Sequence, residues 1–213
     1  MGREFVNIFD GWAESYDASV SGKDPEYRDV FEGYDSILNE VVNRVSGTSI
    51  IEFGTGTGNL TALLVEKNLN VIGFEPNEKM REMTAERFPD KEILDGDLLQ
   101  FEIGEGKIDA IVSSFVFHHL TDEEKGKALK LYSDLLEQNG KIVFADTAFI
   151  TEEAKLEQIK KERARNFHNV ADDLEREYYT TIPILTKLFE EAGFQAHFSK
   201  MNDYVWIMDA TKK

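Results

Sequence analysis

The chain has 213 residues and a formal net charge of −17, with 41 acidic residues against 24 basic ones. This length suits one domain with a full hydrophobic core, and the negative field disfavours RNA or DNA as a substrate. Because the chain contains no cysteine, disulfides and thiolate chemistry are excluded, and a metal site could use only histidine or carboxylate ligands.

The first 47 residues precede any strand pattern and are predicted to be helical. One face of the first helix would carry the apolar or aromatic residues Phe9, Trp12, Ala13 and Tyr16. That face either packs on the core or belongs to a lid that places Tyr16 over a bound ligand. A second helix is predicted over residues 34–45, where apolar positions recur at helical intervals before Ser46-Gly47.

The stretch Ile50–Leu60 predicts a strand, a tight turn and the start of a helix. An apolar run ends in Gly54, Gly56 and Gly58, and a helical pattern follows directly. Bare backbone at such a turn lets a ligand lie close, and the next helix points free N–H groups at it. The spacing E-x-G-x-G-x-G departs from the nicotinamide fingerprint G-x-G-x-x-G, because Asn59 stands where a third small residue is expected.

Residues 71–74 are predicted to form the second strand, with Glu75 at its end. An acidic residue about 20 positions after the glycines is placed to accept the two ribose hydroxyls of a nucleotide-like cofactor. The alternative is a solvated loop carboxylate. Pro76 stops the strand, and Asn77 is expected to cap a helix that runs to about residue 87.

Residues 93–98 are interpreted as the third strand and its exit, which carries two acidic side chains. A carboxylate at such an exit can accept a hydrogen bond from an exocyclic adenine amine. Asp97 and Asp95 are the two candidates for this contact.

The fourth strand is predicted over residues 108–115, and its exit over 116–120 contains His118 and His119. Thr121 and Glu124 have the spacing of a capping box, which predicts the start of a helix. Gly140 is expected to end that helix. A fifth strand is predicted over residues 141–146, with Asp146 at its tip.

Residues 151–181 are rich in charge, and most of these charges would lie on solvated helical faces. A charged helical pair inserted after the fifth strand is also where this class of fold keeps a variable substrate cover. The last helix is predicted from Thr181-Ile182-Pro183 to Gly193. Alternating residues in 194–200 and 204–210 predict a terminal hairpin.

These elements predict an α/β fold with a seven-stranded, mostly parallel sheet, an antiparallel C-terminal hairpin and helices on both faces. We expect one domain over residues 1–213. Its parts would be a helical lead or lid at 1–47, a ligand-binding core at 48–150, a helical cover at 151–181, and a final helix and hairpin at 182–213.

The glycine turn and the order of elements resemble class I methyltransferases that use S-adenosylmethionine (SAM) and act on small molecules. Three longer stretches are similar to the bacterial YrrT family, whose members have no assigned substrate. They are Met-Gly-Arg-Glu-Phe at the start, Ile111–Lys125 with its Phe-His-His-Leu, and Lys141–Phe149. The resemblance implies a Rossmann-like methyltransferase fold.

The resemblance also implies SAM contacts at Gly54, Glu75 and Asp97. The other candidate cofactor contacts are Gly56, Gly58, Tyr16 and Ser114. His118 is the candidate general base, since it follows the fourth strand beside the expected methyl position; the alternative is that both histidines are structural. His119 would point elsewhere if the backbone is extended there. Asp146 is a second candidate for contact with the acceptor.

The expected function is methyl transfer from SAM to a small-molecule acceptor by in-line displacement, with no metal. Two alternatives remain open, a SAM-binding protein without catalysis and an NAD(P)-dependent oxidoreductase. A third is a macromolecular methyltransferase, for which the acidic charge disfavours nucleic acid more than protein. We expect a cytoplasmic location, because no signal-peptide core or membrane-spanning stretch is present. The oligomeric state is left open.

Overall fold

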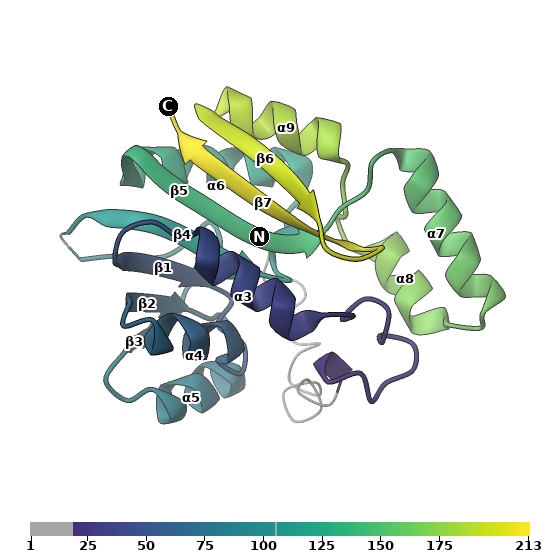
Figure 1. Ribbon diagram of the computed structural model, residues 1–213, viewed down its shortest axis with the longest axis horizontal. Coiled ribbons are helices and arrows are strands. Elements are labelled where there is room, and N and C mark those ends of the chain that lie inside the picture. The colour runs from purple at the N-terminus through teal and green to yellow at the C-terminus, as the bar shows by residue number, and fades with distance from the viewer. Residues whose placement is uncertain (1–18, 105) are drawn as a thin grey trace.

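The computed structural model describes residues 19–104 and 106–213. Its centre is a seven-stranded sheet in the order β3-β2-β1-β4-β5-β7-β6 (Figure 1). The strands are β1 Ser49–Phe53, β2 Asn70–Phe74, β3 Glu92–Leu94, β4 Ile108–Ser114, β5 Leu136–Thr147, β6 Phe194–Lys200 and β7 Val205–Lys212. Strands β1 to β5 pair in parallel, and β7 runs antiparallel to both β5 and β6. The predicted fold class, with its C-terminal hairpin, is confirmed.

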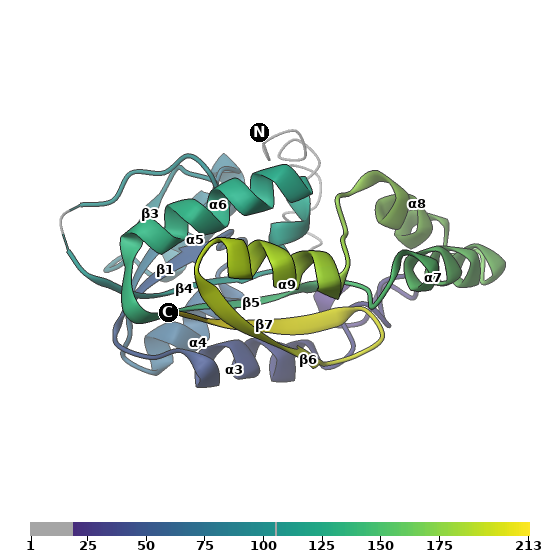
Figure 2. The ribbon, with the colours of Figure 1, turned by 90° about the horizontal axis from the view of Figure 1, so that it is seen from above.

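Helices cover both faces of this sheet. The helices of the described residues are α3 Tyr34–Arg44, α4 Asn59–Glu66, α5 Glu78–Arg87, α6 Asp122–Leu135, α7 Glu152–Ala164, α8 His168–Arg176 and α9 Ile182–Glu191, with a 3-10 turn, η1, at Phe117–His119. Figure 2 shows α6 and α9 on one side of the sheet and α3 and α4 on the other. Helices α7 and α8 pack on each other and project beyond one end of the sheet (Figure 1).

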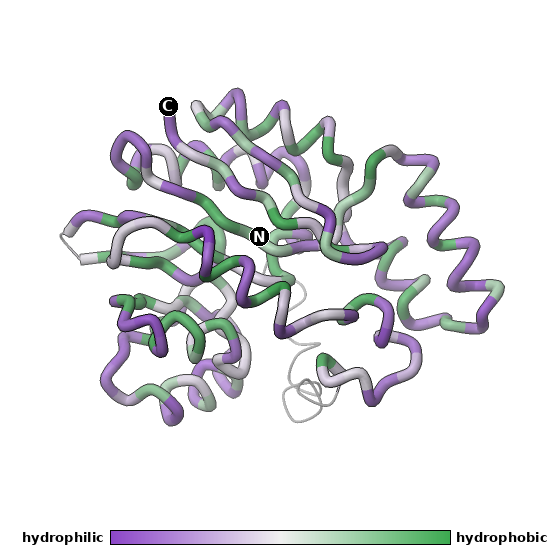
Figure 3. Tube along the Cα trace, viewed as in Figure 1, coloured by the Kyte–Doolittle hydropathy of each residue, from purple (hydrophilic) through white to green (hydrophobic). Residues whose placement is uncertain are grey.

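The central strands are apolar on both faces because each face meets helices. Ile50 and Val112 face the core beneath α3 and α4, whereas their neighbours Ile51 and Ile111 face the core beneath α6 and α9. The apolar segments therefore lie between the sheet and its helices, and the charged stretches of α7 lie on the outside of the molecule (Figure 3). Within the described ranges, none of the helices combines the length and apolar character that a membrane crossing requires.

Two predicted helix starts are confirmed by their caps. The Asn77 side chain accepts a hydrogen bond from the Met80 backbone N–H at 3.0 Å. Thr121 and Glu124 form the reciprocal capping box at the start of α6. These caps fix where the chain turns from the carboxyl ends of β2 and β4 into helices, which is the edge of the sheet where this class of fold binds ligands.

The prediction that a helix ends at Gly140 is wrong. Helix α6 ends at Leu135, and β5 begins at the next residue. The register of β5 against β4 shifts between Leu136 and Lys141, so the intervening residues bulge out of the ladder. Asn139 has a φ of 69° in this bulge, and a Cβ on Gly140 would lie 2.9 Å from Leu136. The glycine therefore permits a tight bulge within the strand.

Candidate functional site

The glycine turn after β1 is closed by backbone hydrogen bonds and positive φ angles. Gly54, Gly56 and Gly58 have φ values of 70°, 54° and 85°, which residues with a Cβ adopt only at a cost. The Gly54 N–H donates to the Phe74 carbonyl at 2.7 Å and so joins the turn to β2. A Cβ on Gly54 would lie 2.3 Å from Val116, whereas one on Gly56 would meet no atom of the described residues within 4 Å. The turn thus packs against the exit of β4 at Gly54 and faces open space at Gly56.

Glu75 is part of this turn and is not a solvated loop residue. It is only 6% exposed. Its carboxylate accepts hydrogen bonds from the backbone N–H groups of Gly56 and Asn77, both at 2.9 Å. Burial raises the pKa of Glu75, and these two hydrogen bonds oppose that effect. A carboxylate offers about four acceptor positions, so the side chain keeps capacity for hydroxyl donors of a ligand.

A second buried carboxylate in the turn, Glu52, was missed as a site residue. It is 1% exposed, and its Oε2 accepts a hydrogen bond from the Thr61 hydroxyl at 2.7 Å. Its Oε1 is buried and has no hydrogen-bond partner among residues 19–104 and 106–213. Burial raises the pKa of Glu52 to about 8. The signal was present in the sequence, because Glu52 is the first letter of the E-x-G-x-G-x-G pattern.

The structure separates the two acidic candidates at the exit of β3. Asp97 is buried, and its Oδ1 accepts hydrogen bonds from the backbone N–H groups of Leu99 and Gln100 at 2.9 Å. The Asp95 side chain is 56% exposed and makes an ion pair with Arg81 at 3.8 Å. Of the two, Asp97 is therefore the one held in a fixed position. Ser114 ends β4 and is half-buried.

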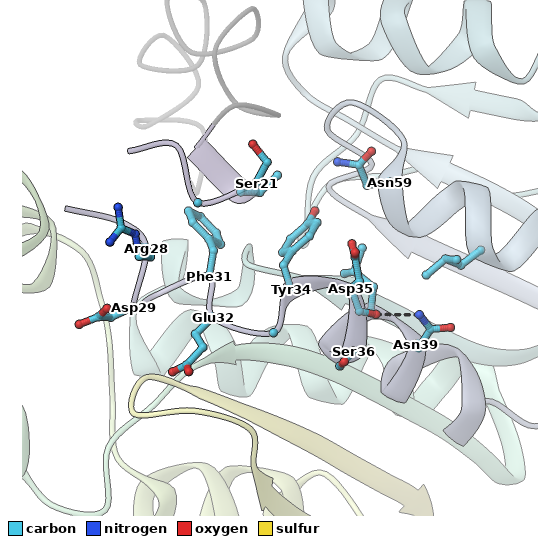
Figure 4. A pocket seen from close by; sticks show the side chains of 15 residues that line it. Ser21, Arg28, Asp29, Phe31, Glu32, Tyr34, Asp35, Ser36, Asn39 and Asn59 are labelled. Carbon is cyan, nitrogen blue, oxygen red and sulfur yellow. Dashed lines mark hydrogen bonds between the residues drawn. The ribbon is translucent and has the colours of Figure 1, made fainter. Parts of the chain in front are cut away.

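The predicted lid residue Tyr16 lies outside the described residues, as do Phe9 and Trp12. The contribution of the first helical face to the site stays a prediction. The chain is described from residue 19 onward, and thirteen residues between Val20 and Asn39 line an open cavity of about 1020 Å³ together with Asn59 and Leu63 of α4. Figure 4 shows Phe31 and Tyr34 next to each other at this cavity, with Asn59 near Tyr34. Because Asn59 directly follows Gly58, the cavity lies beside the glycine turn.

His118 is buried in η1, just past β4, and carboxylates contact both of its ring nitrogens. Its Nδ1 lies 2.6 Å from Oδ1 of Asp146, and its Nε2 lies 3.3 Å from Oε2 of Glu177. Burial opposes the charged form, but the two carboxylates together raise the pKa of His118. Neither ring nitrogen is open to an acceptor in this arrangement. The general-base role of His118 stays a prediction, and this geometry does not favour it.

The backbone at His119 is not extended, so the premise on which His119 was set aside is wrong. Phe115 has a φ of 58°, and the chain turns there into the 3-10 turn that carries both histidines. The two imidazole rings lie 4.2 Å apart between centroids, and both side chains are buried. A positive φ at a bulky residue is uncommon and strained. The strained turn places His118 and His119 together.

Asp146 serves this turn and is not open to an acceptor. It is 1% exposed, and its Oδ2 accepts a hydrogen bond from the His118 backbone N–H at 2.8 Å. Its Oδ1 also accepts a hydrogen bond from the Thr147 backbone N–H at 2.7 Å. The carboxylate at the tip of β5 therefore fixes the position of His118.

The segment predicted as a cover, residues 151–181, contacts the turn η1 that carries His118 and His119. Helices α7 and α8 confirm the predicted helical pair, and the chain that follows α8 crosses η1. The Tyr178 N–H donates to the His118 carbonyl at 3.1 Å, and the buried Lys125 ammonium donates to the Tyr178 carbonyl at 2.7 Å. The Tyr179 ring stacks on His118 with 4.7 Å between centroids. Residues 177–179 therefore cover the exit of β4.

Comparisons with known proteins show the family of this chain. The family model described as "Methyltransferase domain" matches residues 27–197. A protein of Geobacillus sp. that is named an uncharacterized methyltransferase is 53% identical over 214 residues and spans 100% of both chains. A protein of Oceanobacillus iheyensis with the same kind of name is 50% identical over 212 residues, which cover 100% of this chain and 99% of that one.

Solved structures share the fold at low sequence identity. A SAM-dependent methyltransferase of Thermotoga maritima aligns with a TM-score of 0.69 and 18% identity, over 97% of this chain and 99% of that one. The magnesium protoporphyrin IX methyltransferase of Synechocystis, solved with bound SAH, aligns with a TM-score of 0.67 and 19% identity, over 88% and 87% of the two chains. At these identities the likeness concerns the fold alone.

Proposed function

Because this chain belongs to the methyltransferase domain family, we propose that it transfers the methyl group of SAM to a small-molecule acceptor. The observation that carries the proposal is the buried carboxylate of Glu75, which is bonded to the Gly56 N–H. This hydrogen bond joins a buried carboxyl group and a bare backbone turn in one compact site. The narrower resemblance to the YrrT family stays a prediction.

The residues at the turn fit the chemical groups of SAM. SAM carries an ammonium and two ribose hydroxyls that donate hydrogen bonds, and the buried carboxyl groups of Glu52 and Glu75 offer oxygen acceptors for them. The unpartnered Oε1 of Glu52 is a buried acceptor in need of a donor. The open space at Gly56 leaves room for a ligand against the backbone. We assign Glu75 to the ribose hydroxyls and Asp97 to the adenine amine, with Gly54, Gly58, Ser114 and Tyr16 as further contacts.

SAM supplies a methyl group on a positively charged sulfur, and the carbon–sulfur bond breaks as a lone pair of the acceptor forms the new bond to carbon. The task of the chain is alignment, which contributes about 7–11 kcal/mol when reacting groups are held at attack distance. The glycine turn and the buried carboxyl groups hold SAM, which is one of the two reactants. With both ring nitrogens of His118 engaged, the geometry favours an acceptor that needs no general base.

The cavity beside the glycine turn supports a small acceptor. Its volume of about 1020 Å³ is at the upper end of the usual range for small-molecule sites. Aromatic rings and polar side chains line it together, including Phe31, Tyr34 and Asn59. The net charge of −17 acts against nucleic-acid acceptors.

Calorimetric titration tests the cofactor assignment. SAM and its demethylated product should bind with dissociation constants in the micromolar range, about −8 kcal/mol, and NAD should neither bind nor compete. Binding of NAD without binding of SAM would overturn the proposal. SAM binding without turnover on any acceptor would instead indicate a protein that binds SAM without catalysis.

A further inference from the structure

Two histidines and a glutamate converge at the exit of β4. One ligand atom from each of His118, His119 and Glu177 lies within 4.8 Å of the other two, and both histidines are buried. We propose that these three side chains bind one divalent transition-metal ion of the zinc type. This inference does not depend on SAM, and it departs from the expectation that the protein holds no metal.

The spacing of the nearest pair suits a shared ion. His118 Nε2 lies 3.3 Å from Glu177 Oε2. Nitrogen and oxygen ligands at about 2.0–2.2 Å from zinc, at a tetrahedral angle, lie about 3.4 Å from each other. The widest of the three separations is no more than 4.8 Å, which the rotation of one side chain would close.

The groups behind His118 and Glu177 have the form of an orienting shell. Metal-binding histidines usually donate their second ring N–H to a carboxylate, which fixes the ring and its tautomer. Asp146 Oδ1 lies 2.6 Å from His118 Nδ1, and the Asp146 side chain is itself held by backbone N–H groups. The Tyr179 hydroxyl donates to Glu177 Oε2 at 2.6 Å. Asp146 therefore holds His118 at the ring nitrogen that faces away from Glu177, and Tyr179 holds the Glu177 oxygen that faces His118.

The local charges also leave room for a cation. The carboxylates of Asp146 and Glu177 contact His118, and that of Asp173 also acts on it electrostatically. Among the described residues, the cations Lys125 and Arg176 act on His119. Arg176 contacts Oε1 of Glu177 at 3.5 Å, so it approaches the oxygen that does not face His118. Lys125 directs its ammonium to the carbonyls of Leu120 and Tyr178.

The ligand set indicates the class of ion. Two imidazoles and one carboxylate suit zinc and its first-row neighbours, whereas calcium and magnesium prefer oxygen ligands alone. Three protein ligands leave at least one position for an outside ligand. The site adjoins the glycine turn, because Val116, two residues before His118, is the residue that packs on Gly54. The rival account is that His118 bridges the two carboxylates as an imidazolium and that no ion binds.

The test is the zinc stoichiometry of the untagged full chain, measured by competition with a chromophoric chelator. The chain has four histidines and no cysteine, so a matched control exists. The double variant His168→Ala/His197→Ala removes the other two, which are both exposed, and should still bind one zinc ion per chain. Glu177→Gln and His119→Gln should each weaken zinc binding by at least about tenfold.

X-ray absorption of the zinc-loaded wild-type protein keeps the proposal falsifiable if a variant fails to fold. We expect two imidazole ligands and further oxygen ligands around the ion. Wild-type protein that binds no stoichiometric zinc, or a spectrum without two imidazoles, would overturn the proposal. Equal affinity in Glu177→Gln and the wild type would overturn it as well. SAM titration of the zinc-free protein is a separate measurement, so failure of either proposal is distinguishable from failure of the other.

Discussion

The carboxylate of Glu75 accepts a hydrogen bond from the Gly56 backbone N–H at 2.9 Å, and this bond ties the end of β2 to the glycine turn after β1. The hydroxyl of Thr84 in α5 donates to the carbonyl of the same glycine at 2.7 Å. The peptide groups on both sides of Gly56 are therefore fixed before any ligand arrives. Preorganised sites of this kind bind more tightly because less ordering is needed on association.

Replacing Glu75 by alanine should weaken both the cofactor site and the fold. We expect SAM affinity to fall at least about tenfold, because charge-assisted hydrogen bonds contribute about 1.5–3 kcal/mol each. The free energy of unfolding of the ligand-free protein should fall by about 1–3 kcal/mol, since two N–H groups lose their acceptor. Calorimetry and urea denaturation measure the two effects. Asp95→Ala, at the exposed acid after β3, is the matched control, and an unchanged SAM affinity in Glu75→Ala would refute the assignment.

Two glycines of the same turn should respond differently to alanine. Gly54→Ala combines a positive φ with a Cβ placed 2.3 Å from Val116, so we expect a loss of about 2–5 kcal/mol in the free energy of unfolding. Gly56→Ala carries only the φ penalty, about 1–2 kcal/mol. Its methyl group enters the open space, and SAM affinity should fall at least about tenfold, or about 1.4 kcal/mol. Equal stability of the two variants, or full SAM affinity in Gly56→Ala, would contradict this account.

The buried carboxylate of Glu52 should make stability depend on pH. Its pKa is raised from 4.5 to about 8 in the folded protein, so the folded state favours the protonated form. The stability that this proton provides is complete below about pH 4.5 and is lost as the pH rises towards 8. At 1.36 kcal/mol per pKa unit, the upper limit of this loss is about 5 kcal/mol.

Urea denaturation of Glu52→Gln at pH 5 and pH 8 measures this effect. The variant cannot ionise at position 52, so it should gain stability relative to the wild type as the pH rises. Glu92→Gln, at an exposed position of β3, should show no such gain. A constant difference between Glu52→Gln and the wild type at the two pH values would show that Glu52 does not titrate in this range.

The cover should respond to SAM mainly where it crosses the exit of β4. Residues 177–179 contact His118, whereas α7 buries only Ile159 and Glu162. We therefore expect amide hydrogen exchange to slow at residues 177–181 on SAM binding and to stay unchanged in α7. The same experiment measures amide hydrogen exchange in the predicted lid at residues 1–20, with and without SAM. Exchange that is unaltered by SAM in both segments would show that neither closes over the site.

Much of the fold follows from local patterns, but several features of the site do not. The succession of strands and helices along the chain and the caps at Asn77 and Thr121 were predictable, because spacing and capping chemistry act over a few residues. The end of α6 could not be predicted, because the bulge before Gly140 depends on the register of β5 against β4. The position of Glu52 in the glycine motif was visible in the sequence. That one of its carboxyl oxygens is buried without a described partner depends on packing and was not.

The cluster around His118 shows the same limit over longer distances. Asp146 and Glu177 lie far from His118 in the sequence, and only the folding of β5 and of the chain after α8 brings them to the two ring nitrogens. The sequence alone therefore left open whether His118 is a general base or a structural residue. The strained turn at Phe115 carried no signal, since a positive φ is not expected at a bulky residue.

Incubation with methyl-labelled SAM measures the activity proposed for this chain, methyl transfer to a small molecule. The protein would be supplied in parallel with a metabolite extract and with the macromolecular fraction of the same cells, and the labelled product would be identified. The expected result is label in a small-molecule product, lost or strongly reduced in Glu75→Ala. Label that enters only protein or nucleic acid, or no transfer to any fraction by a protein that binds SAM, would contradict it.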